Sequence, residues 1–360
     1  MVKWLRPVRF RLLWFACFAV LTAVLYIFRS NKQLMTAVAG IALRYKQGAA
    51  YVFSFLPFSV TELIIALAVL LALFFIVRTI VVFVRGRGAR REWLIKRVTL
   101  AICVIITVFC LLFILLGASY YAESFEEKSG INARATTVDK LEAVTRSFAE
   151  RLAASAAGVP RNADGVMEIS VDAVFKNTAS LYNGAQRIYP FLAAPRSLPK
   201  PMLLSRWFSH MGYTGFCFPF TGEANINTDQ PACLLPATVS HEMAHQRGIA
   251  REQEANFVAI LACLESGLPE YKYSGAMLGF IHLGNALYKY DPDAYSDIFL
   301  ALPDTVIADI RHNNAYWKQF ESEVSEASQA VYDTFLKSYG QELGIMSYGA
   351  VVDLLIAYYG

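Results

Sequence analysis

The chain has 360 residues, a formal net charge of +4 and 56% hydrophobic residues. Soluble globular proteins contain about 45–50% apolar residues, so the excess argues against an ordinary soluble protein. The small positive charge comes mainly from basic clusters beside apolar runs, which indicates membrane topology and not nucleic-acid binding.

Three apolar runs in the first third of the chain are long enough to cross a bilayer, which takes about 20 residues. They are residues 12–28, 63–84 and 98–117, and Arg78 is the only charge inside them. No small-residue cleavage site follows the first run, so we expect a retained span and not a signal peptide. The sequence therefore predicts a transmembrane region over residues 1–121 and one further domain over residues 122–360.

Basic residues predict the orientation of the spans. They cluster before the first span and again over residues 85–97, and both clusters should be cytoplasmic. We interpret the second cluster as a topology determinant and not as an RNA- or lipid-binding site. The domain after Tyr121 is then extracytoplasmic on a multi-pass protein of a bacterial inner membrane. The link between the first two spans should be outside too, and the apolar spacing over residues 34–55 favours a helix along the membrane surface.

The outer domain is predicted to be mainly helical with a small β element. Residues 122–132 are acidic and polar, as in a short stalk, and a capping pattern at Thr136 opens a helix. Residues 190–201 are proline-rich and indicate a loop. Residues 215–227 predict one or two short strands with a turn near Gly222. The pattern after these strands is helical almost to the end.

An HExxH motif at residues 241–245 carries the chemistry. On a helix, His241 and His245 lie one turn apart on one face, where two imidazoles can share one Zn²⁺. Glu242 is placed to accept the proton of a water that zinc makes acidic near neutral pH. A helix with incidental histidines is the alternative, but the chain has only five histidines.

A third ligand is needed if one position is to stay open for catalysis. Glu252 and Asn256 are spaced i, i+4 on a following helix. Glu252 is the predicted third ligand, and Asn256 is predicted to hold a ligand histidine by its free ring nitrogen. Glu254 is the alternative ligand. Gly248 permits the sharp turn between the two helices.

These residues carry a resemblance. HExxH followed by Glu252 and Asn256 resembles the gluzincin pattern of zinc peptidases, and the segment from Glu252 is similar to that of ImmA-like peptidases, which cleave phage repressors. Residues 219–225, 241–248 and 347–349 together resemble an uncharacterised family of bacterial three-pass membrane proteins with an HEMAHQRG motif. The resemblance implies a mainly α fold: three transmembrane helices and an α-rich zincin-like domain with a β element before the HExxH helix.

The sequence departs from known patterns at three points. Only six residues separate His245 from Glu252, whereas gluzincins have a much longer gap. Asn256 stands where aspartate is usual. Arg251 occupies the place of the last histidine in a metzincin motif, and a guanidinium cannot ligate zinc. These departures bear on the third ligand more than on the two histidines.

Substrate-binding residues are predicted less sharply. A strand edge within residues 218–227 is expected to hold a peptide by backbone hydrogen bonds. Glu223 and Asn225 either line this cleft or only shape a turn, and the sequence leaves both interpretations open. The candidates for stabilising an oxyanion are Tyr348, His282 and His210, and packing is the favoured role of the two histidines. Cys217 and Cys233 are a weak candidate for a disulfide.

Together these features predict a membrane-anchored zinc metallopeptidase that hydrolyses a cell-envelope or other extracytoplasmic protein or peptide. The alternative is a zinc-stabilised binding or sensory domain that cuts nothing. Glu242 favours the enzyme, because a purely structural zinc site does not need it. The sequence indicates neither the substrate nor the oligomeric state.

Overall fold

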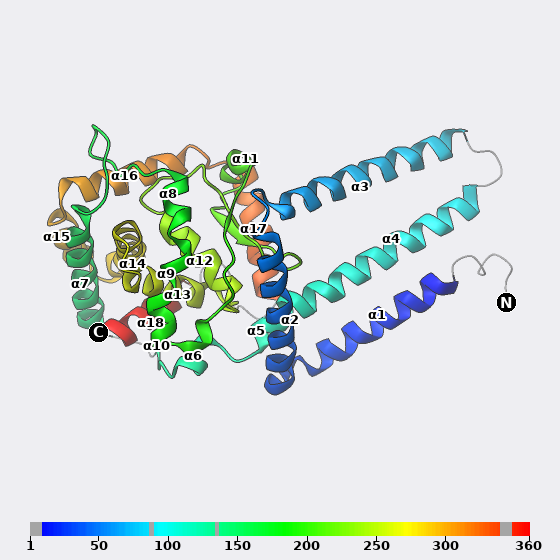
Figure 1. Cartoon of the computed structure of the whole chain (residues 1–360), viewed down its shortest axis with the longest axis horizontal. Helices are drawn as coiled ribbons and strands as arrows, with labels where there is room; N and C mark the ends of the chain where they lie inside the picture. The colour runs from blue at the N-terminus through cyan, green and yellow to red at the C-terminus, as the bar shows by residue number, and fades with distance from the viewer. Residues whose placement is uncertain (1–8, 86–89, 134–136, 339–347) are drawn as a thin grey trace. The chain divides into compact units, whose positions relative to one another are not determined.

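The computed structural model describes residues 9–85, 90–133, 137–338 and 348–360 (Figure 1). The chain forms two compact units. Unit 1 comprises residues 1–42 and 60–122, and unit 2 comprises residues 43–59 and 123–360. Unit 2 therefore includes a segment that precedes the second span, which the expected boundary after residue 121 had assigned to the transmembrane region.

The helices of unit 1 include three that are long and apolar enough to span a membrane, Arg9–Ser30, Val60–Val84 and Trp93–Tyr121. Each contains one of the predicted spans. The elements are α1 (Arg9–Ile27), the 3₁₀ turn η2 (Phe28–Ser30), α3 (Val60–Arg85), α4 (Arg90–Leu112), the π-helical turn η3 (Phe113–Gly117) and α5 (Ala118–Tyr121). The structure therefore has, near its N-terminus, three helices with the length and apolar composition that the sequence predicted for spans.

The spans present their apolar side chains outward. No residue of the most apolar stretch of α3 is buried within the protein. Helix α1 packs along α4, and the Trp14 indole donates a hydrogen bond to Thr107 Oγ1 at 2.8 Å. Apolar surface of this kind is stable only in lipid, which is why composition alone identifies it.

Helix α2 (Lys32–Phe53) links the first two spans and contributes its second half to unit 2. The remaining helices of unit 2 are α6 (Phe125–Ser129), α7 (Val138–Ala156), α8 (Val171–Lys176), α9 (Thr178–Leu181), α10 (Asn183–Ile188), the 3₁₀ turn η4 (Pro190–Leu192), α11 (Ser205–His210), α12 (Leu235–Gln246), α13 (Glu252–Glu265), α14 (Pro269–Tyr290), α15 (Pro292–Leu300), α16 (Asp304–Lys318), α17 (Glu323–Ser338) and α18 (Tyr348–Tyr359).

The core of unit 2 is built around α13. Its residues 257–263 are consecutive apolar side chains, and all are fully buried. A helix that is apolar on every side needs neighbours on every side, and α13 packs against α12, α14, α10 and α18. This central position holds the first turn of α13, which begins at Glu252, against the end of α12.

A three-stranded sheet precedes α12 in the chain. Its order is β1 (Lys200–Pro201), β3 (Ala224–Ile226), β2 (Gly215–Cys217), with β1 parallel and β2 antiparallel to β3. The predicted strands and their turn are present as the β2–β3 hairpin, in which Gly222 has a φ of +65°. The proline-rich stretch differs from expectation, because its last two residues pair with β3 as β1.

The predicted stalk is wrong in one respect. Within residues 122–132 the chain forms α6, which begins at a capping box between Ser124 and Glu127. Phe125 is almost fully buried and packs against the rings of Tyr189, Phe191 and Phe257. One aromatic residue in a polar stretch is enough to fold it onto the core, because the burial of its ring is favourable.

Candidate metal centre

The two histidines of the motif lie on the last two turns of α12. The helix ends at Gln246, and Gly248 follows with a φ of +85°, a left-handed conformation that favours glycine. The Ile249 amide then donates back to Ala244 O at 3.2 Å, which closes the turn. The chain therefore reverses sharply, and α13 begins at Glu252 beside the histidines it has just left.

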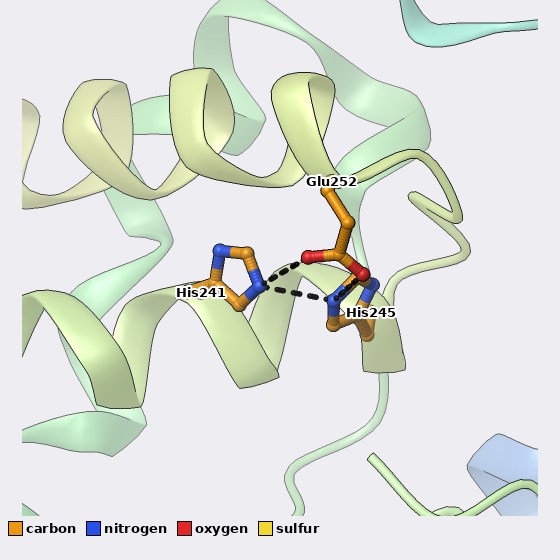
Figure 2. A group of neighbouring side chains, drawn as sticks. All are labelled: His241, His245 and Glu252. Atoms are coloured by element: carbon orange, nitrogen blue, oxygen red, sulfur yellow. Dashed lines mark hydrogen bonds and ion pairs between the residues drawn. The ribbon is translucent and has the colours of Figure 1, made fainter. Parts of the chain in front are cut away.

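The metal cluster consists of His241, His245 and Glu252, whose side chains point toward one another (Figure 2). The two Nε2 atoms are 3.1 Å apart. Glu252 Oε2 lies 3.2 Å from His241 Nε2, and Glu252 Oε1 lies 3.6 Å from His245 Nε2. Tetrahedral zinc with bonds of about 2.0–2.2 Å places its ligand atoms about 3.3–3.6 Å apart. The histidine pair and the facing carboxylate are therefore close to this spacing, with a different Glu252 oxygen facing each histidine.

The charges in the metal cluster are coupled. Burial lowers the pKa of His245, but the neighbouring Glu252 carboxylate outweighs it and raises this pKa to about 9. Burial also raises the pKa of Glu252, yet the two histidines hold it well below its usual value. Without a metal ion, the carboxylate is thus ionised beside an imidazolium at neutral pH. A metal ion bound here would take the place of that proton.

Glu242 lies beside the metal cluster and outside it. Its side chain is 4% exposed, and its Oε2 has no hydrogen-bond partner among the described residues. Burial raises the pKa of Glu242, while His241 and His245 lower it. A buried carboxylate oxygen without a partner is costly, because its lost hydration is not replaced by a hydrogen bond.

The two glutamates at the start of α13 have different environments. The Glu254 carboxylate turns away from the histidines and accepts hydrogen bonds from the amides of Phe125 and Glu126 at 3.0 and 3.4 Å. It therefore satisfies the first amides of α6, and burial raises its pKa. The structure therefore brings Glu252, not Glu254, to the two histidines.

Hydrogen bonds around the metal cluster come from residues that the motif did not indicate. His245 Nδ1 donates to the carbonyl of Ile249 at 2.7 Å, which orients the ring. The Tyr332 hydroxyl, on α17, donates to Glu252 Oε1 at 2.7 Å. Among the described residues, Asn256 makes no hydrogen bond with either histidine, so the expected role of Asn256 passes to Ile249 for His245. No spacing rule could have found Tyr332, which lies 80 positions from Glu252.

The predicted oxyanion candidates are Tyr348, His282 and His210. Only the backbone of Tyr348 is described, at the start of α18, and its side chain lies outside the described part of the chain. His282 is buried on α14, and burial, with a smaller contribution from His241, lowers its pKa to about 4. His210 on α11 packs edge-on against Phe320 at 4.9 Å. The ring contact of His210 agrees with a packing role.

The β2–β3 hairpin buries the two residues expected near a cleft. Glu223 and Asn225 are 1% and 0% exposed. The Asn225 amide donates to Glu223 O at 3.0 Å, and its Oδ1 accepts from Ser59 Oγ at 2.6 Å. These contacts favour turn shaping over cleft lining. Cys217 and Cys233 are both free thiols, so the structure contains no disulfide between them.

The second half of α2 packs against the hairpin and the end of α12. A Cβ on Gly222 would lie 2.1 Å from the carbonyl oxygen of Lys46, and a Cβ on Gly248 would lie 2.8 Å from Leu43. Gln246 at the end of α12 donates to Gly222 O at 2.7 Å. Both glycines thus combine a positive φ with a close approach of α2, which explains why no larger residue fits there.

Residues 41–356 match the model of a family described as "Protein of unknown function (DUF3810)". The chain belongs to the DUF3810 family. The match begins inside α2 and therefore covers the metal cluster, the hairpin and the part of α2 that packs on them, as well as the second and third spans of this DUF3810 protein. No curated protein and no solved structure matches the chain.

Proposed function

We propose that this DUF3810 protein is a membrane-anchored zinc-dependent peptidase. The observation that supports this most directly is the convergence of His241, His245 and Glu252. The two Nε2 atoms lie 3.1 Å apart, and each faces one Glu252 oxygen at 3.2 or 3.6 Å, beside the unpartnered oxygen of Glu242. Three protein ligands leave the fourth position of a tetrahedral zinc ion open, as catalytic sites do.

The residues around the metal cluster suit proton transfer. A zinc ion in this position would lower the pKa of water to about 7. Glu242, raised in pKa by burial, would accept a proton from the attacking water and deliver it to the leaving amine. The phenol of Tyr332, one hydrogen bond from Glu252, is the group best placed to stabilise charge that develops on the scissile carbonyl.

The hairpin supplies a place for the substrate. Strand β2 is the edge of the sheet, and a Cβ on its Gly215 would lie 2.9 Å from the Glu242 side chain. A peptide added to β2 as a further strand would have its backbone beside Glu242. The proposed substrate is therefore an extended segment of a protein or peptide, and the alternation of basic segments in the sequence favours an extracytoplasmic one at the bacterial inner membrane.

The alternative is a non-catalytic zinc-stabilised binding or sensory domain. The observation in its favour is limited access, because the three cluster side chains are only 15–19% exposed. Structural zinc sites, however, have four protein ligands, and the described residues bring together three. This difference favours the peptidase.

The test uses the full chain in detergent micelles, with an unfolded casein as substrate and zinc measured by mass spectrometry. The wild type should hold one zinc and cleave the casein, and a chelator should abolish cleavage reversibly. Glu242→Gln should keep zinc and lose activity by about 10²–10⁴-fold. The exposed Glu168→Gln is the matched control and should behave as wild type. If Glu242→Gln cleaves as well as Glu168→Gln, the peptidase proposal is wrong.

A further inference from the structure

Helix α2 is joined to a membrane span at each end. One residue, Asn31, separates it from the end of the first spanning segment, and residues 54–59 separate it from α3. Two successive spans leave and re-enter a bilayer at the same surface, so both ends of α2 are tied to that surface. A helix of 22 residues is about 33 Å long. With such short links at both ends, it must run along the membrane surface and not away from it.

The two faces of α2 differ in burial. Ala42, Lys46 and Ala50 are buried on one face. On the opposite face Ile41 and Val52 are 68% and 61% exposed, and Tyr45 between them is also exposed. Positions 41, 45 and 52 share one side of a helix. The Tyr45 hydroxyl donates a hydrogen bond to the Phe220 carbonyl at 2.9 Å, but 51% of the Tyr45 side chain stays exposed, beside the larger exposed fractions of Ile41 and Val52.

The outer face has the composition of a membrane interface. Tyrosines are enriched at the boundary between headgroups and acyl chains, and Tyr45 and Tyr51 are both exposed here. The exposed Arg44 lies on the same side of the helix, where it can meet lipid phosphates. Phe55, 75% exposed, continues the apolar face just past the helix end. Such a face lies about 5–10 Å into the headgroup region when lipid covers it.

We propose that the outer face of α2, defined by Ile41, Tyr45, Val52 and Phe55, is a lipid-binding surface. The inner face of the same helix contacts the turn at Gly222 and the turn at Gly248, three residues after His245. One helix, about 10–12 Å in diameter, therefore separates the lipid from the elements that carry the metal cluster.

If the protein is the proposed peptidase, the lipid-binding surface also determines which substrates reach the metal cluster. A metal cluster separated from the lipid by one helix would act on extended segments that lie at the membrane surface, such as the juxtamembrane part of a membrane-anchored protein. A substrate free in solution would reach the same site without help from the bilayer. The peptidase is thus expected to prefer a peptide tethered to lipid over the same peptide in solution.

The lipid contact is tested without any catalytic readout. The full chain carries Cys17→Ala, because Cys17 is the exposed thiol among cysteines that are otherwise buried or half-buried. A polarity-sensitive fluorophore is attached at Val52→Cys or, as a control, at Leu300→Cys, an exposed apolar position at the end of α15. In phosphatidylcholine vesicles the label at position 52 should show blue-shifted emission and loss of iodide quenching, and the label at position 300 should stay in water.

Two results would overturn the lipid-binding surface. One is full iodide quenching at position 52. The other is protection at position 52 that disappears when the protein is diluted within the vesicles, because a second copy would then be the occupant. The substrate preference is measured separately with one peptide, free or lipid-tethered. Wild type should cleave the tethered form faster, and Val52→Asp should lose that advantage while cleaving the free form as before. Equal ratios in the two proteins would refute the preference alone.

Discussion

The metal cluster and the β2–β3 hairpin both bury polar side chains, but only one of them satisfies all of its groups. In the hairpin region, Asn227 donates to Ser209 Oγ and to Tyr213 O, and its Oδ1 accepts from the Asp229 amide. Beside the metal cluster, Glu242 Oε2 has no partner among the described residues, and three ligand atoms face one another. A closed network stabilises a fold, whereas an open one is costly and indicates a role beyond folding.

The largest difference in effect is expected between substitutions of the two glutamates at the start of α13. Glu252→Gln removes a charged ligand and should lose the zinc. Glu254→Gln removes a charge that caps α6, so it should keep the zinc and cost about 1–2 kcal/mol of unfolding free energy. Zinc content and urea unfolding of the two variants measure both effects. If Glu254→Gln loses zinc and Glu252→Gln retains it, then Glu254, not Glu252, is the third zinc ligand.

Tyr332 tests how far the open network extends. Tyr332→Phe keeps the ring against Tyr213 but removes the hydrogen bond to Glu252. Losing a group that supports a metal ligand typically costs about 10–100-fold in metal affinity or activity. Titration with a competing chelator and turnover measurements give the two values. The matched control is Tyr213→Phe, whose hydroxyl donates to the Ser328 carbonyl and not to the metal cluster. Equal effects of both changes would show that Tyr332 only holds α17 in place.

A substitution in the β2–β3 hairpin should lower stability and leave zinc binding unchanged. Asn225→Ala removes the buried hydrogen bond from the Ser59 hydroxyl and the one to the Glu223 carbonyl. The expected cost is about 1–3 kcal/mol of unfolding free energy, with zinc stoichiometry unchanged in the folded protein. Chemical unfolding and metal analysis of the same sample provide the measurement. An Asn225→Ala protein as stable as wild type that has lost its zinc would place Asn225 in the metal site after all.

A further expected effect concerns pH. The pKa of His245 is raised from 6.5 to about 9 in the metal-free fold, so its protonation stabilises that fold. This contribution is fully present below pH 6.5 and is lost as pH rises toward 9. Zinc needs the neutral imidazole, so zinc affinity should rise over the same interval. Thermal unfolding with and without zinc between these pH values checks both signs. His245→Ala should remove both dependences.

The sequence predicts features that depend on neighbouring residues, and it fails for features that depend on residues far away in the chain. The histidines at i, i+4, the short strands and the turn at Gly222 depend on neighbours along the chain, and local periodicity reports them. The folding of residues 122–132 onto the core through Phe125 and the pairing of β1 with β3 depend on distant partners. A polar segment with one aromatic residue resembles a stalk until the surface that buries the aromatic residue is known.

The sequence by itself determined the three long apolar helices and the placement of two histidines on one helix face, because apolar length and helical spacing are properties of a single helix. Only the tertiary structure shows which of Glu252 and Glu254 faces these histidines. The turn after Gly248 rotates the start of α13 so that one carboxylate meets the histidines and the other meets α6. Only the tertiary structure brought in Tyr332 from α17 and α2 from the membrane region, since both are placed by packing between segments far apart in the chain.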